Sequence, residues 1–388
     1  MKNSNKTMVK LGIYSCALLM MGAIGVASNL SNIMAAFPEV SPTTMVFYMI
    51  SIPCLIVIPV TIITGKLMET IAKKSLVIIG ILFWLIGGTA PFFMNNLTAI
   101  IAMRCLIGIG VGMVQTLTAA LVVENFDSQE ERNQTMGNVA AFQMLGCIIF
   151  SLVAGYLGSM GWKIAFLVHL IALVSLCGAV VLLPYKKPFA TSGEKTKFKA
   201  TGAMWMWTIS FFVFMAGGQT YANSASAIIT EMGLGNSVQA GYSLAIFAFG
   251  GVVSGLVFAK FAAIFKNYTV TAGSVIAAIS YIIMVFASNL ILAYIGAFIF
   301  GFALSICIPS LINGAAGAVD GASSSMAVSI ATCLQNIGMA ICPYIVNPIG
   351  TGISSASNFT VNQGAMLAGT AIMLVVAVVK AIGNKKTS

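Results

Sequence analysis

The sequence has very little charge for its length. Of its 388 residues only 7% are charged, and the chain contains nine acidic residues and a single histidine, whereas 59% of its residues are hydrophobic. A soluble domain carries roughly 25% charged residues. The shortage of charge therefore argues against a soluble enzyme or binding domain and indicates a protein that lies mostly within a lipid bilayer.

The sequence also lacks recognisable catalytic or metal-binding patterns. All eight cysteines lie in apolar stretches, without zinc-like spacing or an extracellular disulfide framework: Cys16, Cys54, Cys105, Cys147, Cys177, Cys307, Cys333 and Cys342. No Gly-x-x-x-x-Gly-Lys-Ser/Thr motif for a nucleotide is present. A membrane enzyme would need clustered carboxylates or histidines inside its spans. We therefore expect no metal, no cofactor and no enzymatic activity.

The chain does contain twelve long apolar stretches. A helix needs about 20 apolar residues to cross the hydrocarbon of a bilayer, and only helices or closed barrels satisfy their backbone in lipid. These stretches are too long and too evenly apolar to be barrel strands. The sequence thus predicts an all-α membrane protein with spans near 11–34, 44–64, 75–93, 98–122, 135–157, 163–183, 202–227, 238–259, 268–287, 290–314, 323–346 and 361–381.

Positive charges occupy alternate gaps between these stretches. With the N-terminus in the cytoplasm, 17 of the 19 basic residues fall on the cytoplasmic side, Lys163 falls outside and Arg104 lies within a helix. Because cytoplasmic loops are enriched in Lys and Arg, we expect a multi-pass protein of the cell membrane with both termini in the cytoplasm. The net charge of +10 then reflects topology and contact with anionic lipid, not nucleic-acid binding.

The longest hydrophilic stretch, about residues 186–199, divides the spans into six and six. We predict two pseudo-symmetric six-helix bundles over 1–184 and 202–388, joined by a cytoplasmic linker over 185–201. A short pattern supports a repeat, because Gln143-Met-Leu-Gly146 and Gln335-Asn-Ile-Gly338 lie 192 positions apart. Duplicated bundles that rock about a central site are a common design of secondary transporters.

The loop after the second span carries a recognisable motif. It consists of Gly65-Lys-Leu67-Met-Glu69-Thr-Ile-Ala-Lys73-Lys74 and resembles the signature Gly-x-Leu-x-Asp-x-x-Gly-Arg-Arg/Lys of the major facilitator superfamily. A glutamate replaces the acid of the signature, and an alanine replaces its second glycine. The resemblance implies the major facilitator fold and a cytoplasmic gate in this loop.

The resemblance also implies partners for the gate residues. Glu69 is expected to face the start of the eleventh helix near residues 323–325, where an acid would stabilise the positive end of a helix. Lys73 is expected to pair with Glu124 at the end of the fourth helix. Gly65 would allow a tight turn and close helix approach. The alternative is an ordinary basic loop with a single stray glutamate.

The fourth span contains an arginine, which is rare within a membrane. Arg104, Gly108, Gly112 and Gln115 share one helical face, and the stretch resembles the family's Arg-x-x-x-Gly-x-Gly motif. An arginine inside a span costs roughly 2.5–3.5 kcal/mol on insertion scales, so it normally faces a polar cavity. The alternative is a side chain that reaches the outer headgroups. The resemblance allows a role in binding a substrate anion or in proton coupling.

The fifth span keeps only part of the family's antiporter signature, Gly-x-x-x-Gly-Pro-x-x-Gly-Gly. Gly146 and Gly155 match, whereas a serine and a phenylalanine replace the proline and another glycine. The corresponding stretch of the eleventh span keeps Gly338 and Pro343, and the proline is expected to bend its helix. The degraded signature leaves the direction of transport open.

In the family's fold, spans 1, 4, 7 and 10 line a central cavity. Polar residues on these spans, with the paired glutamines of spans 5 and 11, are candidate substrate contacts: Asn29, Asn32, Gln143, Gln219, Thr220, Tyr221, Asn223, Ser305, Ser310, Asn313 and Gln335. The alternative for each is hydrogen bonding between helices, worth about 0.6 kcal/mol on average. No Asp or Glu lies at the centre of a predicted span, and His169 on the sixth span is expected to serve packing.

Together these patterns predict a secondary active transporter of a small organic solute that works by alternating access. The first hypothesis is proton-coupled efflux of an amphiphilic compound. The alternative is uptake or exchange of a small anionic metabolite with Arg104 as the anion clamp, and a channel is a rival that would show flux without saturation. The expected partners are the solute, a proton or other ion and the bilayer, with a monomer as the expected state.

Overall fold

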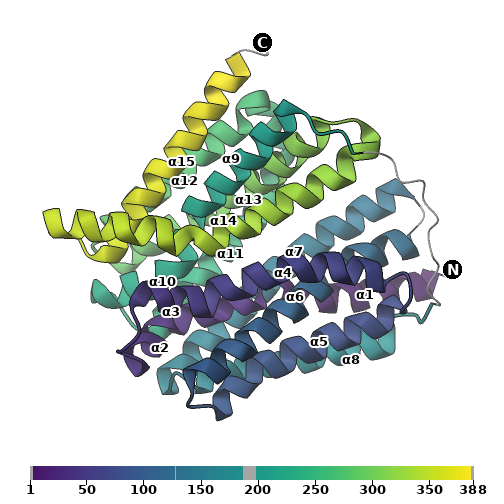
Figure 1. Ribbon diagram of the computed structural model, residues 1–388, viewed down its shortest axis with the longest axis horizontal. Coiled ribbons are helices and arrows are strands. Elements are labelled where there is room, and N and C mark those ends of the chain that lie inside the picture. The colour runs from purple at the N-terminus through teal and green to yellow at the C-terminus, as the bar shows by residue number, and fades with distance from the viewer. Residues whose placement is uncertain (1–2, 127, 187–197, 386–388) are drawn as a thin grey trace. The chain divides into compact units, whose positions relative to one another are not determined.

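The computed structural model describes residues 3–126, 128–186 and 198–385, and every regular element in these ranges is a helix (Figure 1). The all-α class predicted from the sequence is therefore confirmed. Most of the predicted linker, residues 187–197, lies outside the described residues, as do the last three residues of the tail.

Ten helices in the described part of the chain are long and apolar enough to cross a membrane. One of them, Ser237–Val285, contains two predicted spans, α11 (Ser237–Phe265) and α12 (Thr269–Val285), separated by the short turn Lys266–Tyr268. Predicted span 202–227 forms two shorter helices, α9 (Gly202–Gly218) and α10 (Thr220–Glu231). The number twelve itself stays a prediction.

The chain divides into two compact units. Unit 1 comprises Met1–Pro38 and Tyr48–Gly193, and unit 2 comprises Glu39–Phe47 and Glu194–Ser388. The short helix α3 (Pro42–Val46) thus belongs with unit 2, where Asn347 Nδ2 donates a hydrogen bond to Thr43 Oγ1 at 2.9 Å and the rings of Phe47 and Tyr344 pack edge to face.

In unit 1, α6 packs against both α4 and α5, and α1 packs against α7 and α8 (Figure 1). The Asn96 side chain begins α6 by accepting hydrogen bonds from the first free backbone N–H groups, as Ser128 does for α7. The helices of this unit are α1 (Asn3–Met20), η1 (Gly22–Asn29), α2 (Leu30–Ala36), η2 (Phe47–Ser51, whose last four residues lie in unit 1), α4 (Ile52–Leu67), α5 (Lys73–Thr89), η3 (Ala90–Phe93), α6 (Leu97–Asn125), α7 (Gln129–Met160), η4 (Ile164–Ile171) and α8 (Ala172–Leu182).

In unit 2, α13 (Leu290–Gly317) packs against α11 and α12, while α14 (Gly321–Ala356) packs against α9 and α15 (Val361–Lys385) (Figure 1). Asn289 caps α13 and Asp320 caps α14. Hydrogen bonding with Ser323 holds the pKa of Asp320 below its ordinary value, because these bonds favour the charged carboxylate.

Helices in a bilayer associate mainly by close packing at small residues, and the two units repeat the same close contacts. Gly108 of α6 lies against the carbonyl oxygen of Pro53 in α4, where a Cβ atom would come within 2.8 Å of it. Gly301 of α13 lies in the same way against the carbonyl oxygen of Phe247 in α11. The two glycines are 193 positions apart, and the two carbonyls 194.

A second repeated contact involves the glycines of the short motif. Gly146 of α7 packs against the carbonyl oxygen of Leu18 in α1, and Gly338 of α14 packs against that of Phe212 in α9. These pairs lie 192 and 194 positions apart. The repeat of the Gln-x-x-Gly motif in the sequence therefore extends to the packing of helix backbones inside each unit.

Candidate functional site

The predicted gate loop joins α4 to α5. Lys73, the first residue of α5, donates from Nζ to Glu124 Oε1 at 2.8 Å, which is the partner expected for it. Lys74 Nζ donates to the carbonyl oxygen of Val180 at 2.7 Å. The ion pair ties the start of α5 to the end of α6, and its part in gating stays a prediction.

Three other residues of the loop differ in their surroundings. Gly65 lies inside α4, and a Cβ there would meet no atom of a neighbouring element of unit 1 within 4 Å. Its close approach to another helix stays a prediction. Leu67 packs against the apolar core of unit 1. Glu69 is exposed in the turn. Its contact with residues 323–325 stays a prediction.

We expect the Lys73–Glu124 pair to make a modest contribution to stability. Both side chains are about one-fifth exposed, with 23% and 22% of their surfaces accessible, so the coupling energy should be about 0.2–1 kcal/mol. A double-mutant cycle of Lys73→Ala and Glu124→Ala, followed by thermal unfolding, measures it. Lys74→Ala combined with Glu124→Ala is the control, and equal coupling in both cycles would contradict the assignment.

Arg104 is the most buried charge in the described spans of unit 1, with 1% of its surface exposed. Its Nε and Nη2 donate to the carbonyl oxygen of Met49 at 2.8 and 2.5 Å. In a regular helix that carbonyl would bond to the N–H of residue 53, but Pro53 has none. Met49 lies in the π-helical segment η2, and Arg104 donates to its carbonyl, to which Pro53 cannot donate. The Arg104 Nη1 has no hydrogen-bond partner among the described residues.

The helical face that carries Arg104 packs closely against α4. A Cβ atom at Gly108 would meet Pro53 and Ile56, and one at Gly112 would meet Val60 at 2.9 Å. The glycines thus allow close contact as expected, but Arg104 lies in this contact and does not extend to outer headgroups. Gln115, one turn beyond Gly112, is half-buried.

The candidate residues of the first span hold helices together. Asn29 Nδ2 donates to the carbonyl oxygen of Trp162 at 2.9 Å, and Asn32 Nδ2 donates to that of Gly158 at 3.1 Å and to Asn29 Oδ1. These bonds satisfy carbonyl groups at and just beyond the end of α7, which a helix leaves unpaired. Asn29 and Asn32 thus fit the alternative in which these amides form hydrogen bonds between helices.

The first helix of each unit is interrupted where the candidates cluster. In unit 1 the 3-10 segment η1 separates α1 from α2. In unit 2 the interruption between α9 and α10 is the single residue Gln219, which keeps helical angles (φ −66°, ψ −16°), and next to it the Tyr221 N–H donates to Tyr281 OH at 3.0 Å. Past the second break, Tyr221 OH bonds to Ser243 Oγ at 2.8 Å, and its ring packs with Phe247 and Phe300.

Asn223 differs from the other amides at these breaks. It is 3% exposed, and neither its Oδ1 nor its Nδ2 has a hydrogen-bond partner among the described residues. The Cys342 thiol lies beside it, and Thr220 Oγ1 lies 3.5 Å from the same sulfur. The thiol is only a weak hydrogen-bonding group, so most of the hydrogen-bonding capacity of the Asn223 amide stays unused. An unsatisfied buried amide costs about 1–3 kcal/mol, so this position favours a ligand that supplies a donor and an acceptor.

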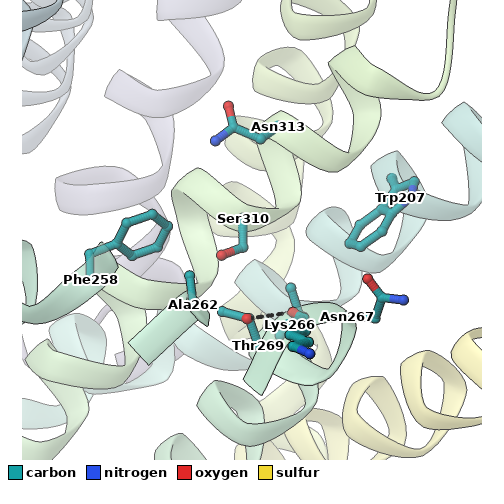
Figure 2. Close-up of a pocket in the computed structure, with 9 residues that line it drawn as sticks. Trp207, Phe258, Ala262, Lys266, Asn267, Thr269, Ser310 and Asn313 are labelled. Atoms are coloured by element: carbon teal, nitrogen blue, oxygen red, sulfur yellow. Dashed lines mark hydrogen bonds between the residues drawn. The ribbon is translucent and has the colours of Figure 1, made fainter. Parts of the chain in front are cut away.

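The remaining candidates are less informative. Gln143, Ser305 and Gln335 are half-buried. Gly155 lies within α7, and Pro343 lies within α14, each of which is a single continuous helix. Asn313 is exposed and lines a cavity in unit 2 with Ser310 (Figure 2).

One functional candidate was missed because it was assigned to the wrong region. Lys380 is one of the 17 basic residues counted on the cytoplasmic side, although predicted span 361–381 contains it; in the structure it lies inside α15 with 1% of its surface exposed. Its Nζ lies 2.8 Å from the ring centroid of Trp207 and has no hydrogen-bond partner. The available signal was the unbroken apolar run before it, which places this lysine within one turn of the end of the span.

The helical units, the membrane-length helices and the repeat define an integral, multi-pass membrane protein of a transporter class. The model of the Major Facilitator Superfamily matches residues 12–343, and the chain belongs to this superfamily of transporters of small solutes, which are not enzymes. The predicted family and fold are thereby confirmed.

Relatives by sequence match only part of the chain. A probable vesicular acetylcholine transporter-B of Danio rerio is 24% identical over 167 residues, which cover 43% of this chain and 34% of the relative. The uncharacterized transporter EfpA of Mycobacterium tuberculosis (strain ATCC 25618 / H37Rv) is 28% identical over 141 residues, covering 36% of this chain and 26% of EfpA. The chain thus spans about a third or less of these curated relatives.

Solved structures share the fold over nearly the whole chain. The human organic anion transporter MFSD10 has a TM-score of 0.67 at 13% identity, covering 98% of this chain and 100% of its own. The POT family transporter PepTSo has a TM-score of 0.78 at 12% identity, covering 98% of each chain. At such identities the likeness shows the fold alone.

Proposed function

We propose that the protein carries a small organic solute across the cell membrane by secondary active transport with alternating access. The observation that carries this proposal is the unpartnered amide of Asn223 beside the break in the first helix of unit 2. Transporters commonly build their substrate sites at discontinuous helices near the bilayer midplane, in repeated halves that move against each other.

The surroundings of Asn223 favour an amphiphilic solute. The amide offers one acceptor and two donors, and its 3% exposure places these groups in the buried, mainly apolar interior of unit 2. Binding sites for small molecules combine such apolar walls with a few placed polar groups. We propose efflux as the direction and the proton as the coupling ion, with a monomer as the working unit.

The distribution of basic residues supports a cytoplasmic location for both termini, since 17 of the 19 fall on one side of the expected topology. The acids of the described part of the chain lie at helix ends or in turns, as Glu69, Glu124 and Asp320 do. Proton coupling would accordingly use a group other than a carboxylate at the centre of a span.

Asn223→Ala should weaken substrate binding about tenfold or more, because the solute would lose hydrogen bonds to a buried amide. The measurement is a thermal-shift screen of metabolites and drugs on the purified protein, followed by titration of each hit. Asn138→Ala is the matched control, since Asn138 already donates to Tyr14 OH at 2.9 Å. Equal affinities in wild type and Asn223→Ala would overturn the assignment.

Arg104 supports a second candidate, the exchange of a small anionic metabolite. Its Nη1 is buried without a partner, whereas the other two nitrogens are held by Met49. An arginine binds a carboxylate or phosphate best through two nitrogens at once, and Arg104 has only one nitrogen that is not already bonded to Met49. This candidate is therefore second to the site at Asn223.

A further inference from the structure

Unit 2 contains a cavity of about 430 Å³ near the turn between α11 and α12. Figure 2 shows Phe258 and Ala262 of α11, Trp207 of α9 and Asn313 of α13 arranged around it. The remaining lining residues come from the turn, the start of α12 and α13: Lys266, Asn267, Thr269, Val270 and Ser310. The lining combines aromatic and aliphatic groups with amides and hydroxyls.

The cavity has positive charge and no negative charge in its lining. Lys266 is its only charged lining residue, and no ion pair of Lys266 occurs among the described residues. Thr269 and Val270 form the first turn of the 17-residue helix α12, whose N-terminus has no side-chain cap. The Thr269 N–H is bonded to the Lys266 carbonyl oxygen, but the dipole at a helix N-terminus still favours an anion.

A second lysine, Lys380, lies behind Trp207, which forms part of the cavity lining. The buried ammonium of Lys380 rests on the face of the Trp207 ring, which lines the cavity, and it has no hydrogen-bond partner. Gly314 lets α13 approach the same ring closely. A buried ammonium without a counter-ion is costly, and an anion in the cavity would lower that cost through the indole.

The equivalent lysine in unit 1 already has an acidic partner. There the lysine at the start of α5, Lys73, pairs with Glu124 at the end of α6. The offset of 193 positions that relates α6 to α13 places Gly317 at the end of α13 where unit 1 has Glu124, and Lys266 where unit 1 has Lys73. The nearby acid of unit 2, Asp320, is engaged in capping α14. Unit 2 thus keeps the lysine and the helix start but lacks the acid.

We propose that this cavity binds the phosphate headgroup of an anionic phospholipid from the cytoplasmic leaflet. Lys266 and the N-terminus of α12 pair with the phosphate, Asn313 contacts the polar headgroup, and Phe258 and Ala262 contact the first acyl carbons. The apolar lining favours a lipid over free phosphate. The assignment uses the cytoplasmic orientation proposed above but does not depend on the substrate.

The test measures lipid binding by the full-length protein in detergent. Short-chain phosphatidylglycerol, phosphatidylcholine with the same chains, and inorganic phosphate are titrated while thermal stability and lipid adducts in native mass spectra are recorded. We expect phosphatidylglycerol to stabilise the wild type and Lys266→Gln to weaken its binding about fivefold or more, as loss of one basic contact with an anionic lipid predicts.

Two further variants make the outcome specific. Lys260→Gln removes an exposed lysine of α11 that does not line the cavity, and it should bind phosphatidylglycerol as the wild type does. Ala262→Leu fills part of the cavity without changing charge and should weaken binding. Equal loss in Lys260→Gln and Lys266→Gln, equal stabilisation by phosphatidylcholine, or full stabilisation by inorganic phosphate alone would each overturn the proposal. The readout is independent of transport, so its failure leaves the proposed function untouched.

Discussion

Gly301→Leu should unfold the protein or reduce its stability by about 3 kcal/mol or more. The glycine lies against a backbone carbonyl of α11, which cannot move aside as a flexible side chain would. Inserting side-chain atoms into a packed core typically costs about 1–3 kcal/mol, and a contact with rigid backbone lies at the upper end. Yield of monodisperse protein and the midpoint of thermal unfolding measure the effect.

The same helix supplies the matched control. Gly317 ends α13, and no described atom lies within 4 Å of its Cβ position, so Gly317→Leu should be nearly neutral. The same comparison in unit 1 uses Gly108→Leu, which should reduce thermal stability strongly, and Gly65→Leu, which should reduce it little. Similar stability of both variants in either pair would contradict the packing that the two units share.

Arg104→Ala should reduce stability by about 1–3 kcal/mol, because it leaves the Met49 carbonyl unpaired inside the protein. The structure offers a specific rescue. Pro53→Ala restores an N–H at the position from which a regular helix would bond to that carbonyl. The double variant Arg104→Ala with Pro53→Ala should therefore regain most of the lost thermal stability, while Pro53→Ala alone should change it little.

The rescued variant also separates the two functional candidates. If Arg104 binds a substrate anion, the double variant is stable but loses solute binding with its pH response intact. If Arg104 serves proton coupling, it keeps solute binding and loses the pH dependence of transport. No rescue of stability by Pro53→Ala would show that the Met49 bond is not the reason for the burial of Arg104.

The hydropathy and charge of the sequence are sufficient to predict the helical class, whereas the family and the Lys73–Glu124 pair follow from the resemblance of the loop motif to the family signature. Long apolar runs are unambiguous because lipid allows few alternatives, and the pair follows from a motif in a short loop. The breaks at η1 and at Gln219 are not predictable from the same signal. The mean hydropathy of a stretch depends only on its residue types, so it does not reveal where a helix is interrupted.

Other features depended on distant residues that no local pattern connects. Arg104 is unusual in the sequence alone, but its partner is the carbonyl of Met49, 55 positions away. Lys380 was assigned to the tail because positive charges cluster there, whereas Trp207 on another helix covers its ammonium. Gly65 matched a motif without the crowding that would require a glycine.

Counterflow in proteoliposomes tests the central claim most directly. Vesicles containing the purified protein are loaded with a saturating concentration of the unlabelled solute found in the binding screen, and then diluted into a trace of the labelled solute. Alternating access predicts a transient accumulation of label above equilibrium, which Asn223→Ala should diminish at the same trace concentration. Simple equilibration without an overshoot, with flux that rises linearly with solute, would show a pore and contradict the account.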